Sequence, residues 1–159
     1  MMTKEEILDA AAQIFRIKGY HATSMSDIAG AVNLQKASLY HHVSSKQDIL
    51  LELLDQALEL LTGEIISIVR DEELSSDKKL RQMIYAYLNA LISYVDLSSV
   101  LLMEHRSLNP ERHARHIPNR DRFEALWRKV IEEGMQTDVF CCAETSLTAR
   151  NLLGAMNWV

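Results

Sequence analysis

Hydrophobic residues recur at intervals of three and four positions along almost the whole chain, the spacing that gives an α-helix one apolar face. The most extended apolar stripe covers more than five turns and predicts a long helix over about residues 45–70. Together the stripes predict helices over about 3–18, 24–31, 35–43, 45–70, 77–95, 100–108 and 109–134, the last restarted or kinked at Pro118, and a final helix from about Glu144 to the last residue.

Capping and turn residues mark several of these boundaries. Thr3 and Ser24 each have an acidic residue three positions later, the capping box that satisfies exposed backbone donors at a helix start. Gly19 supplies the left-handed residue that ends the first helix. A tight turn separates the second and third helices, and Asn33 suits it because asparagine tolerates positive φ.

Composition then narrows the class of protein. The chain has 159 residues, enough for one domain or for a small domain joined to a medium one. At 48% hydrophobic and 25% charged it has the composition of a soluble globular protein, which excludes disordered, collagen-like and membrane-spanning classes. Five glycines and two prolines are too few for the turns of a sheet-rich chain, so we expect an all-α fold.

The charge is unevenly distributed. The net charge of −5 argues weakly against a nucleic-acid partner, since phosphate binding needs lysine and arginine. However, residues 1–46 carry five basic and four acidic groups, whereas residues 47–80 carry three and nine. Residues 34–46 contain no acid at all. An acidic middle therefore masks a slightly basic first segment.

The first segment has the pattern of a helix-turn-helix, two short helices joined by a tight turn and followed by a long helix. A reading helix presents donors and small side chains at its N-terminal end, and Gln35, Lys36 and Ser38 suit that role. We expect Tyr40, His41 and Lys46 to reach the sugar-phosphate backbone. The predicted packing between the two helices sets Ile28, Ala29 and Val32 against Leu34, Ala37 and Leu39.

This stretch resembles the DNA-binding domain of the TetR family of transcriptional repressors. The resemblance is carried by GY at 19–20, TSMSDIA at 23–29, VNLQKASLYHHV at 32–43 and Lys46. It implies a homodimer whose helix-turn-helix domains, residues 1–46, bind a palindromic DNA operator. Residues 47–159 would form an antiparallel helical domain for dimerisation and for a small-molecule effector that lowers DNA affinity.

The same resemblance assigns roles to single residues. Ser24 and Met25 would face phosphate at the start of the second helix, and Lys46 would hold phosphate at the start of the fourth. Gln35, Lys36, Ser38, Tyr40 and His41 would carry the recognition helix, whereas we expect His42 to be structural. Asn33 stands where the family usually has glycine, a replacement that the turn accepts.

The C-terminal half is similar to family members that repress fatty-acid and steroid catabolism, which implies an acyl-CoA thioester as effector. Pro118 interrupts what tends to be one continuous helix in those relatives. Apolar residues there either line a cavity or form ordinary core, and Arg106 or Arg122 is available for an anionic head group. The candidate lining residues are Met83, Tyr87, Leu91, Tyr94, Met103, Phe123 and Trp127.

Two other interpretations remain open. A metal sensor would use His105, His113 and His116 with Glu104 and Asp121, but the spacing is poor and neighbouring arginines oppose a cation. A redox sensor would use the adjacent pair Cys141 and Cys142, which is badly placed for a structural disulfide and favours a reducing cytoplasm. No metal or cofactor is therefore expected.

A helical enzyme or an adaptor that merely carries the helix-turn-helix is a further alternative. The sequence has no glycine-rich phosphate loop, nucleophile elbow or zinc-protease motif, so we expect no enzyme. No secretory signal is expected at the N-terminus, and the longest apolar run, residues 83–95, is shorter than the ~20 residues of a membrane span. The last helix has no stop signal, which predicts that the functional chain continues beyond Val159 and that its dimer interface is incomplete.

Overall fold

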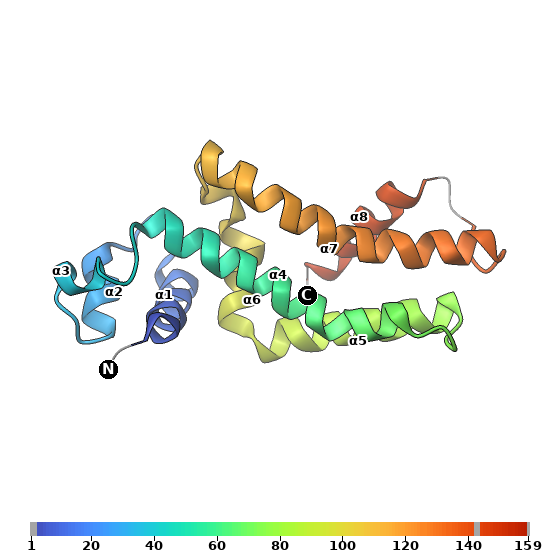
Figure 1. Cartoon of the computed structure of the whole chain (residues 1–159), viewed down its shortest axis with the longest axis horizontal. Helices are drawn as coiled ribbons and strands as arrows, with labels where there is room; N and C mark the ends of the chain where they lie inside the picture. Colours follow the sequence, from blue (N-terminus) through green and yellow to red (C-terminus); the bar gives the residue numbers. More distant parts are fainter. Residues whose placement is uncertain (1–2, 142–143, 159) are drawn as a thin grey trace. The chain divides into compact units, whose positions relative to one another are not determined.

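The computed structural model describes residues 3–141 and 144–158, and every regular element within these ranges is helical (Figure 1). This confirms the all-α prediction. The elements are α1 (Lys4–Lys18), α2 (Met25–Ala31), α3 (Lys36–Leu39), α4 (Lys46–Arg70), α5 (Ser76–Ser93), α6 (Val95–Glu104), the 3₁₀ turn η1 (His105–Ser107), α7 (Pro110–Gln136) and α8 (Thr145–Met156).

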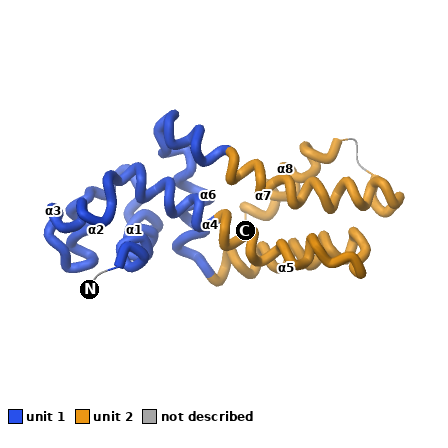
Figure 2. Tube along the Cα trace, in the orientation of Figure 1, with its two compact units in different colours: residues 1–57, 94–117 blue, residues 58–93, 118–159 orange. Residues whose placement is uncertain are grey.

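The chain divides into two compact units (Figure 2). Unit 1 comprises residues 1–57 and 94–117, and unit 2 comprises residues 58–93 and 118–159. Helices α4 and α7 contribute residues to both units. These are units of packing, so the functional boundary expected at residues 46 and 47 stays a prediction.

Unit 1 is built on one hydrophobic core. Helix α1 packs on α2 and α6, and it buries Phe15 at its C-terminal end. The Thr3 capping box is present, with the Glu6 N–H donating to Thr3 Oγ1 at 3.2 Å, so the helix begins where its sequence predicts. The core also includes Ile7, Leu8, Ile28, Leu39, Ile49, Leu50, Leu53, Leu54 and Val100, all at most 1% exposed.

Unit 2 has its own core. Met83 and Tyr87 of α5 are buried, as are Phe123 and Trp127 of α7. Further buried positions are Leu61, Ile65, Val69, Ala90, Val130, Ile131, Ala149 and Met156. A buried charge links three helices, because the Lys79 ammonium donates to the Val69 carbonyl at 3.2 Å and to Glu133 Oε2 at 3.1 Å. The ammonium thus compensates for its loss of water with an acceptor and a counter-ion.

The predicted bounds of the third and sixth helices were wrong. The third helix spans only Lys36–Leu39, because the backbone tightens there to bonds between residues three apart, such as His41 N–H to Ser38 O at 3.1 Å. The sixth helix begins at Val95 rather than at residue 100, directly after the chain turns at Tyr94.

Two further corrections concern the last two helices. Helix α7 continues through Pro118 and passes Gly134, which was expected to end it. A Cβ on Gly134 would lie 2.1 Å from Phe140, so this glycine is needed for the close approach of that ring. Helix α8 ends at Met156 with Asn157 as its cap, instead of running to the last residue.

No single helix in the described residues is long and apolar enough to cross a bilayer. The bent pair Ser76–Ser93 and Val95–Ser107 together has the length and composition of a span.

Candidate functional site

The turn between α2 and α3 has the geometry that the sequence predicts. Asn33 adopts φ 54°, a left-handed conformation that asparagine accepts more readily than most residues. Its N–H donates to the Gly30 carbonyl at 3.2 Å, and the Leu34 N–H donates to the Ala29 carbonyl at 2.9 Å. These bonds join the two short helices into one helix-turn-helix unit.

The packing beneath this unit largely follows the prediction. Ile28 and Leu39 are fully buried, Ala29 and Val32 are buried, and Leu34 packs against the same core. Ala37 is the exception, because it is exposed and makes no part of the interface. Helix α3 has only four residues, so a single buried side chain, Leu39, anchors it.

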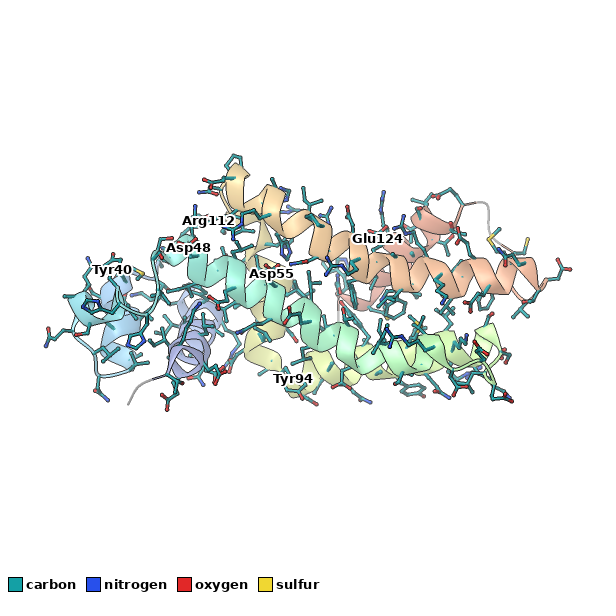
Figure 3. The ribbon with its side chains drawn as sticks, in the orientation of Figure 1. Tyr40, Asp48, Asp55, Tyr94, Arg112 and Glu124 are labelled. Atoms are coloured by element: carbon teal, nitrogen blue, oxygen red, sulfur yellow. The ribbon has the colours of Figure 1, made fainter. Side chains whose placement is uncertain are left out.

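The outer surface of α3 presents the residues expected to read DNA. Gln35, Lys36 and His41 are exposed, and Ser38 is half-buried. Tyr40 is 47% exposed and lies at the C-terminal cap of α3 rather than in the core (Figure 3). No described ion pair involves residues 34–43. The side chains of this surface therefore remain available to a phosphate or a base edge.

The start of α2 is held by a second capping box. The Asp27 N–H donates to Ser24 Oγ at 3.1 Å, and Ser24 donates from both its backbone N–H and its hydroxyl to Asp27 Oδ2. These bonds, together with Lys18 at 3.0 Å, hold the pKa of Asp27 well below its usual range. Both donors of Ser24 are engaged in the cap, and Met25 is partly buried against the core. Their phosphate contacts stay predictions.

Lys46 has a structural role that its sequence did not reveal. Its ammonium donates to the Tyr20 carbonyl at 2.8 Å and to the Thr23 carbonyl at 2.6 Å, and it lies 4.3 Å from the centre of the Tyr20 ring. Burial lowers the pKa of Lys46. Two of the three ammonium protons thus brace the loop between α1 and α2 against α4. The phosphate contact assigned to Lys46 stays a prediction.

Gln47 organises a set of contacts that sequence reasoning missed. Its Nε2 donates to the Tyr20 hydroxyl at 2.7 Å and to the Ser107 carbonyl at 2.8 Å. Its Oε1 accepts from the Asn109 N–H at 2.8 Å. Burial raises the pKa of Tyr20. These four residues, here called the Gln47 network, tie α4 to the loop after α1 and to the chain between η1 and α7. No local sequence signal distinguishes this glutamine.

Two side-chain contacts, at Asp48 and Asp55, continue the same connection along α4 (Figure 3). Arg112 Nε donates to Asp48 Oδ1 at 2.8 Å, and His116 Nδ1 lies 2.8 Å from Asp55 Oδ1. The guanidinium, with the Ser45 hydroxyl, lowers the pKa of Asp48. His116 is buried and paired, which leaves its Nδ1 engaged with a carboxylate. The helix-turn-helix and the first two turns of α7 are therefore parts of one packed unit.

Unit 2 contains the aromatic residues proposed to bind an effector. Tyr87, Phe123 and Trp127, here called the aromatic cluster, have ring centres 5.7–6.3 Å apart. The Tyr87 hydroxyl donates to Asn157 Oδ1 at 2.6 Å, and burial raises the pKa of Tyr87 to about 12. Trp127 Nε1 is buried and has no hydrogen-bond partner among the described residues. Apart from the paired Tyr87 hydroxyl and this unpaired indole N–H, the side chains of the cluster are apolar.

The other candidate effector residues are divided between the two units. Met83 is buried in the core of unit 2, and Leu91 is half-buried. Met103 and Arg106 belong to unit 1, where Met103 is 75% exposed and Arg106 is exposed. Tyr94, also in unit 1, is 45% exposed. Their assignment as lining residues stays a prediction.

The described residues contain no group of three or more histidine, cysteine or acidic side chains placed to hold a metal ion. Among the histidines proposed as ligands, burial lowers the pKa of His105, and His116 is paired with Asp55. Cys141 is exposed, whereas Cys142 lies outside the described residues.

Comparison with known proteins places this geometry in a family. Residues 7–53 match the model of bacterial regulatory proteins of the tetR family, and residues 73–159 match a tetracyclin repressor-like C-terminal domain. The chain belongs to the TetR family. At the level of that family it is a DNA-binding transcriptional regulator and not an enzyme.

Individual relatives agree with this class. The chain is 29% identical over 138 residues to the HTH-type transcriptional repressor KstR2 of Rhodococcus jostii (strain RHA1), a match that covers 86% of this chain and 67% of that protein. Other curated regulators match at 50% identity over 46 residues and are covered over only 25% of their length. The KstR2 match supports the expected similarity to acyl-CoA- and steroid-related repressors of the family.

Two solved structures show the same fold. PfmR from Thermus thermophilus superposes with a TM-score of 0.87 at 34% identity, over 96% of this chain and 82% of that one. AibR, solved in complex with isovaleryl coenzyme A and operator DNA, superposes with a TM-score of 0.89 at 24% identity, over 98% of this chain and 84% of its own.

Proposed function

We propose that the chain works as a homodimeric repressor that binds a palindromic operator and is released by a small-molecule effector. The observation that supports operator binding is the exposed, acid-free surface of residues 34–43, held by the Asn33 turn. In such a dimer the two α3 helices would lie about one turn of DNA apart, ~34–36 Å. A regulator of this kind acts in the cytoplasm, where the chromosome is.

Operator binding is tested with labelled duplexes tiled across the region upstream of the protein's own gene, measured by fluorescence anisotropy over a range of salt concentrations. Each phosphate contact contributes about 0.9 to the slope of log affinity against log salt, so we expect a steep slope. Lys36→Ala should reduce affinity, and Gln35→Ala should change base preference. Lys78→Ala, an exposed lysine of α5, is the matched control and should change neither. Salt-insensitive binding would contradict the proposal.

The dimer is tested separately by light scattering coupled to size exclusion. A palindromic operator requires two copies of α3, so one protein dimer per duplex is expected in a titration with the operator found above. Binding of one monomer per duplex would contradict the proposed symmetry.

For the effector we propose an acyl-CoA thioester, or a similar apolar anionic molecule, bound at the aromatic cluster of unit 2. Three rings and Met83 supply apolar contact area, and the exposed Arg122 beside Phe123 is a candidate partner for phosphate groups. The AibR complex supports this choice of class, because that protein, which has this fold, binds an acyl-CoA thioester. Effector and operator must weaken each other's binding by the same factor, since their coupling is reciprocal.

A thermal-shift screen with isovaleryl-CoA and longer acyl-CoA thioesters tests the effector. A thioester that raises the melting temperature should also release the labelled operator, whereas free coenzyme A should do neither. Stabilisation without release would show that the site binds acyl thioesters but does not regulate DNA binding.

A further inference from the structure

The indole N–H of Trp127 is the unusual group in the core of unit 2. The side chain is 0% exposed, and Nε1 has no acceptor among the described residues. Buried donors in folded proteins are almost always paired, since an unpaired donor has lost its water without compensation. A donor that stays unpaired in a buried cluster is therefore a candidate for a ligand contact.

Other buried polar side chains of unit 2 already have partners. The Tyr87 hydroxyl donates its only proton to Asn157 Oδ1 at 2.6 Å, so it cannot donate to a ligand. Glu124 pairs with Arg150 at 3.1 Å, and the buried Lys79 pairs with Glu133 at 3.1 Å. Among the buried side-chain nitrogen and oxygen atoms of the described residues, Trp127 Nε1 is the one with no hydrogen-bond partner.

The chemistry of the surroundings selects the kind of acceptor. Tyr87 and Phe123, the ring partners of Trp127, offer no positive charge that would compensate a buried carboxylate or phosphate. An uncharged carbonyl oxygen needs only one donor. It is also an acceptor that an otherwise apolar acyl group carries.

We propose that Trp127 Nε1–H donates a hydrogen bond to a carbonyl oxygen in the acyl part of the effector and thereby selects carbonyl-bearing acyl groups over plain alkyl chains. The inference rests on the effector class proposed above. Trp127 is then a specificity-determining residue, whereas Phe123 supplies only apolar contact.

Three probes that share coenzyme A and differ in the acyl part test this assignment by isothermal titration calorimetry. Hexanoyl-CoA carries the thioester carbonyl, and S-hexyl-CoA is the thioether that lacks it. S-(5-oxohexyl)-CoA restores a carbonyl near the far end of the chain. The wild-type protein should bind one of the carbonyl probes about tenfold more tightly than S-hexyl-CoA, the size expected for a buried hydrogen bond. The preferred carbonyl probe identifies which oxygen accepts.

Trp127→Phe keeps a ring and removes the donor. The variant should therefore bind the carbonyl probe and S-hexyl-CoA with about equal affinity. The control Phe123→Leu should weaken carbonyl and thioether probes together and keep their ratio. If Trp127→Phe does not fold, 3-benzothienylalanine at position 127 removes the N–H at nearly constant volume. The Trp127 indole proton resonance should also move downfield with the preferred carbonyl probe and not with S-hexyl-CoA.

The outcomes separate the two levels of proposal. Equal binding of all three probes by the wild-type protein overturns the role of Trp127 and leaves the acyl-CoA class intact. A preference for carbonyl that persists in Trp127→Phe does the same, and indicates another donor such as a bound water. Binding of none of the probes overturns the effector class and this assignment with it.

Discussion

The Gln47 network of unit 1 and the aromatic cluster of unit 2 satisfy their polar groups in opposite ways. In the Gln47 network each donor and acceptor of the side-chain amide has a partner, at 2.7–2.8 Å. In the aromatic cluster the Trp127 N–H has none among the described residues. When every polar group has a partner, the hydrogen bonds hold parts of the fold together. When a buried donor in an apolar surrounding has no partner, it is free to bind an acceptor on a ligand.

The contrast extends to charge. Unit 1 connects α4 with the start of α7 through Asp48, Arg112, Asp55 and His116, all in pairs at 2.8 Å. Unit 2 gains its buried contacts mainly from rings and aliphatic side chains. We therefore expect substitutions at these polar contacts of unit 1 to act through lost hydrogen bonds, and substitutions in the aromatic cluster of unit 2 to act through lost volume.

The largest effect should come from Trp127→Ala, which removes a fully buried ring from unit 2. Truncating a buried aromatic residue costs about 3–5 kcal/mol in the free energy of unfolding. Phe15→Ala is the matched change in the core of unit 1 and should cost a similar amount. Urea unfolding followed by circular dichroism measures both, and a cost below about 1 kcal/mol for Trp127→Ala would show that its ring is not packed.

Gln47→Leu should follow, with a loss of about 2–3 kcal/mol, because it leaves the Tyr20 hydroxyl, the Ser107 carbonyl and the Asn109 N–H without partners. The control Gln56→Leu lies on the same helix at a half-buried glutamine whose side chain makes no hydrogen bond within the described residues. It should change stability little. Equal losses of stability for the two variants would show that the hydrogen bonds of Gln47 contribute no more than an unpaired glutamine side chain.

A pair of glycine substitutions tests how tightly unit 2 is packed. A Cβ at position 134 would overlap the Phe140 ring, so Gly134→Ala should cost about 1–2 kcal/mol. Gly63 of α4 has open space around its Cα, and Gly63→Ala should instead stabilise the helix by about 0.5–1 kcal/mol. Thermal melts of the two variants should shift in opposite directions. A stable Gly134→Ala protein would mean that Phe140 can move away without cost.

The smallest effect concerns the Asp48–Arg112 pair and depends on pH. The pKa of Asp48 is lower in the folded protein than in the unfolded chain, so its contribution is present above the unfolded value and is lost as the pH falls through the folded one. For a partly exposed pair that contribution is below about 1 kcal/mol. Asp48→Asn should therefore lower stability at pH 7 and lower it less near pH 2, as measured by urea unfolding. A constant deficit at both pH values would contradict the ionic contribution.

Much of the helix-turn-helix was predictable from the sequence alone. The capping boxes at Thr3 and Ser24, the positive φ of Asn33 and the exposed face of Gln35 and Lys36 all appear in the structure as expected. Each rests on residues no more than four positions apart, so local chemistry is sufficient to predict it. The family followed from the same segment, and the family model confirms it.

The wrong predictions concern where helices end, which depends on packing that a local pattern does not contain. Residues 40–43 continue an apolar and aromatic pattern, yet α3 ends at Leu39 because the backbone there turns toward the start of α4. Pro118 does not restart α7, because the helix continues through it as a single element, and a kink there stays a prediction. Gly134 was expected to end that helix. Instead, glycine is required at this position because a side chain would overlap the Phe140 ring.

The amino-acid sequence determined the helical class, the helix starts and the turn that forms the helix-turn-helix, because those features depend on hydrogen bonds and apolar periodicity within a few residues. Only the tertiary structure decided the contacts of Lys46 and Gln47 and left the Trp127 N–H without a partner among the described residues. The contacts of Lys46 and Gln47 join residues between 23 and 62 positions apart. The isolation of the Trp127 N–H is likewise a property of everything packed around it. Such contacts exist only once distant segments have been brought together by burial of the cores.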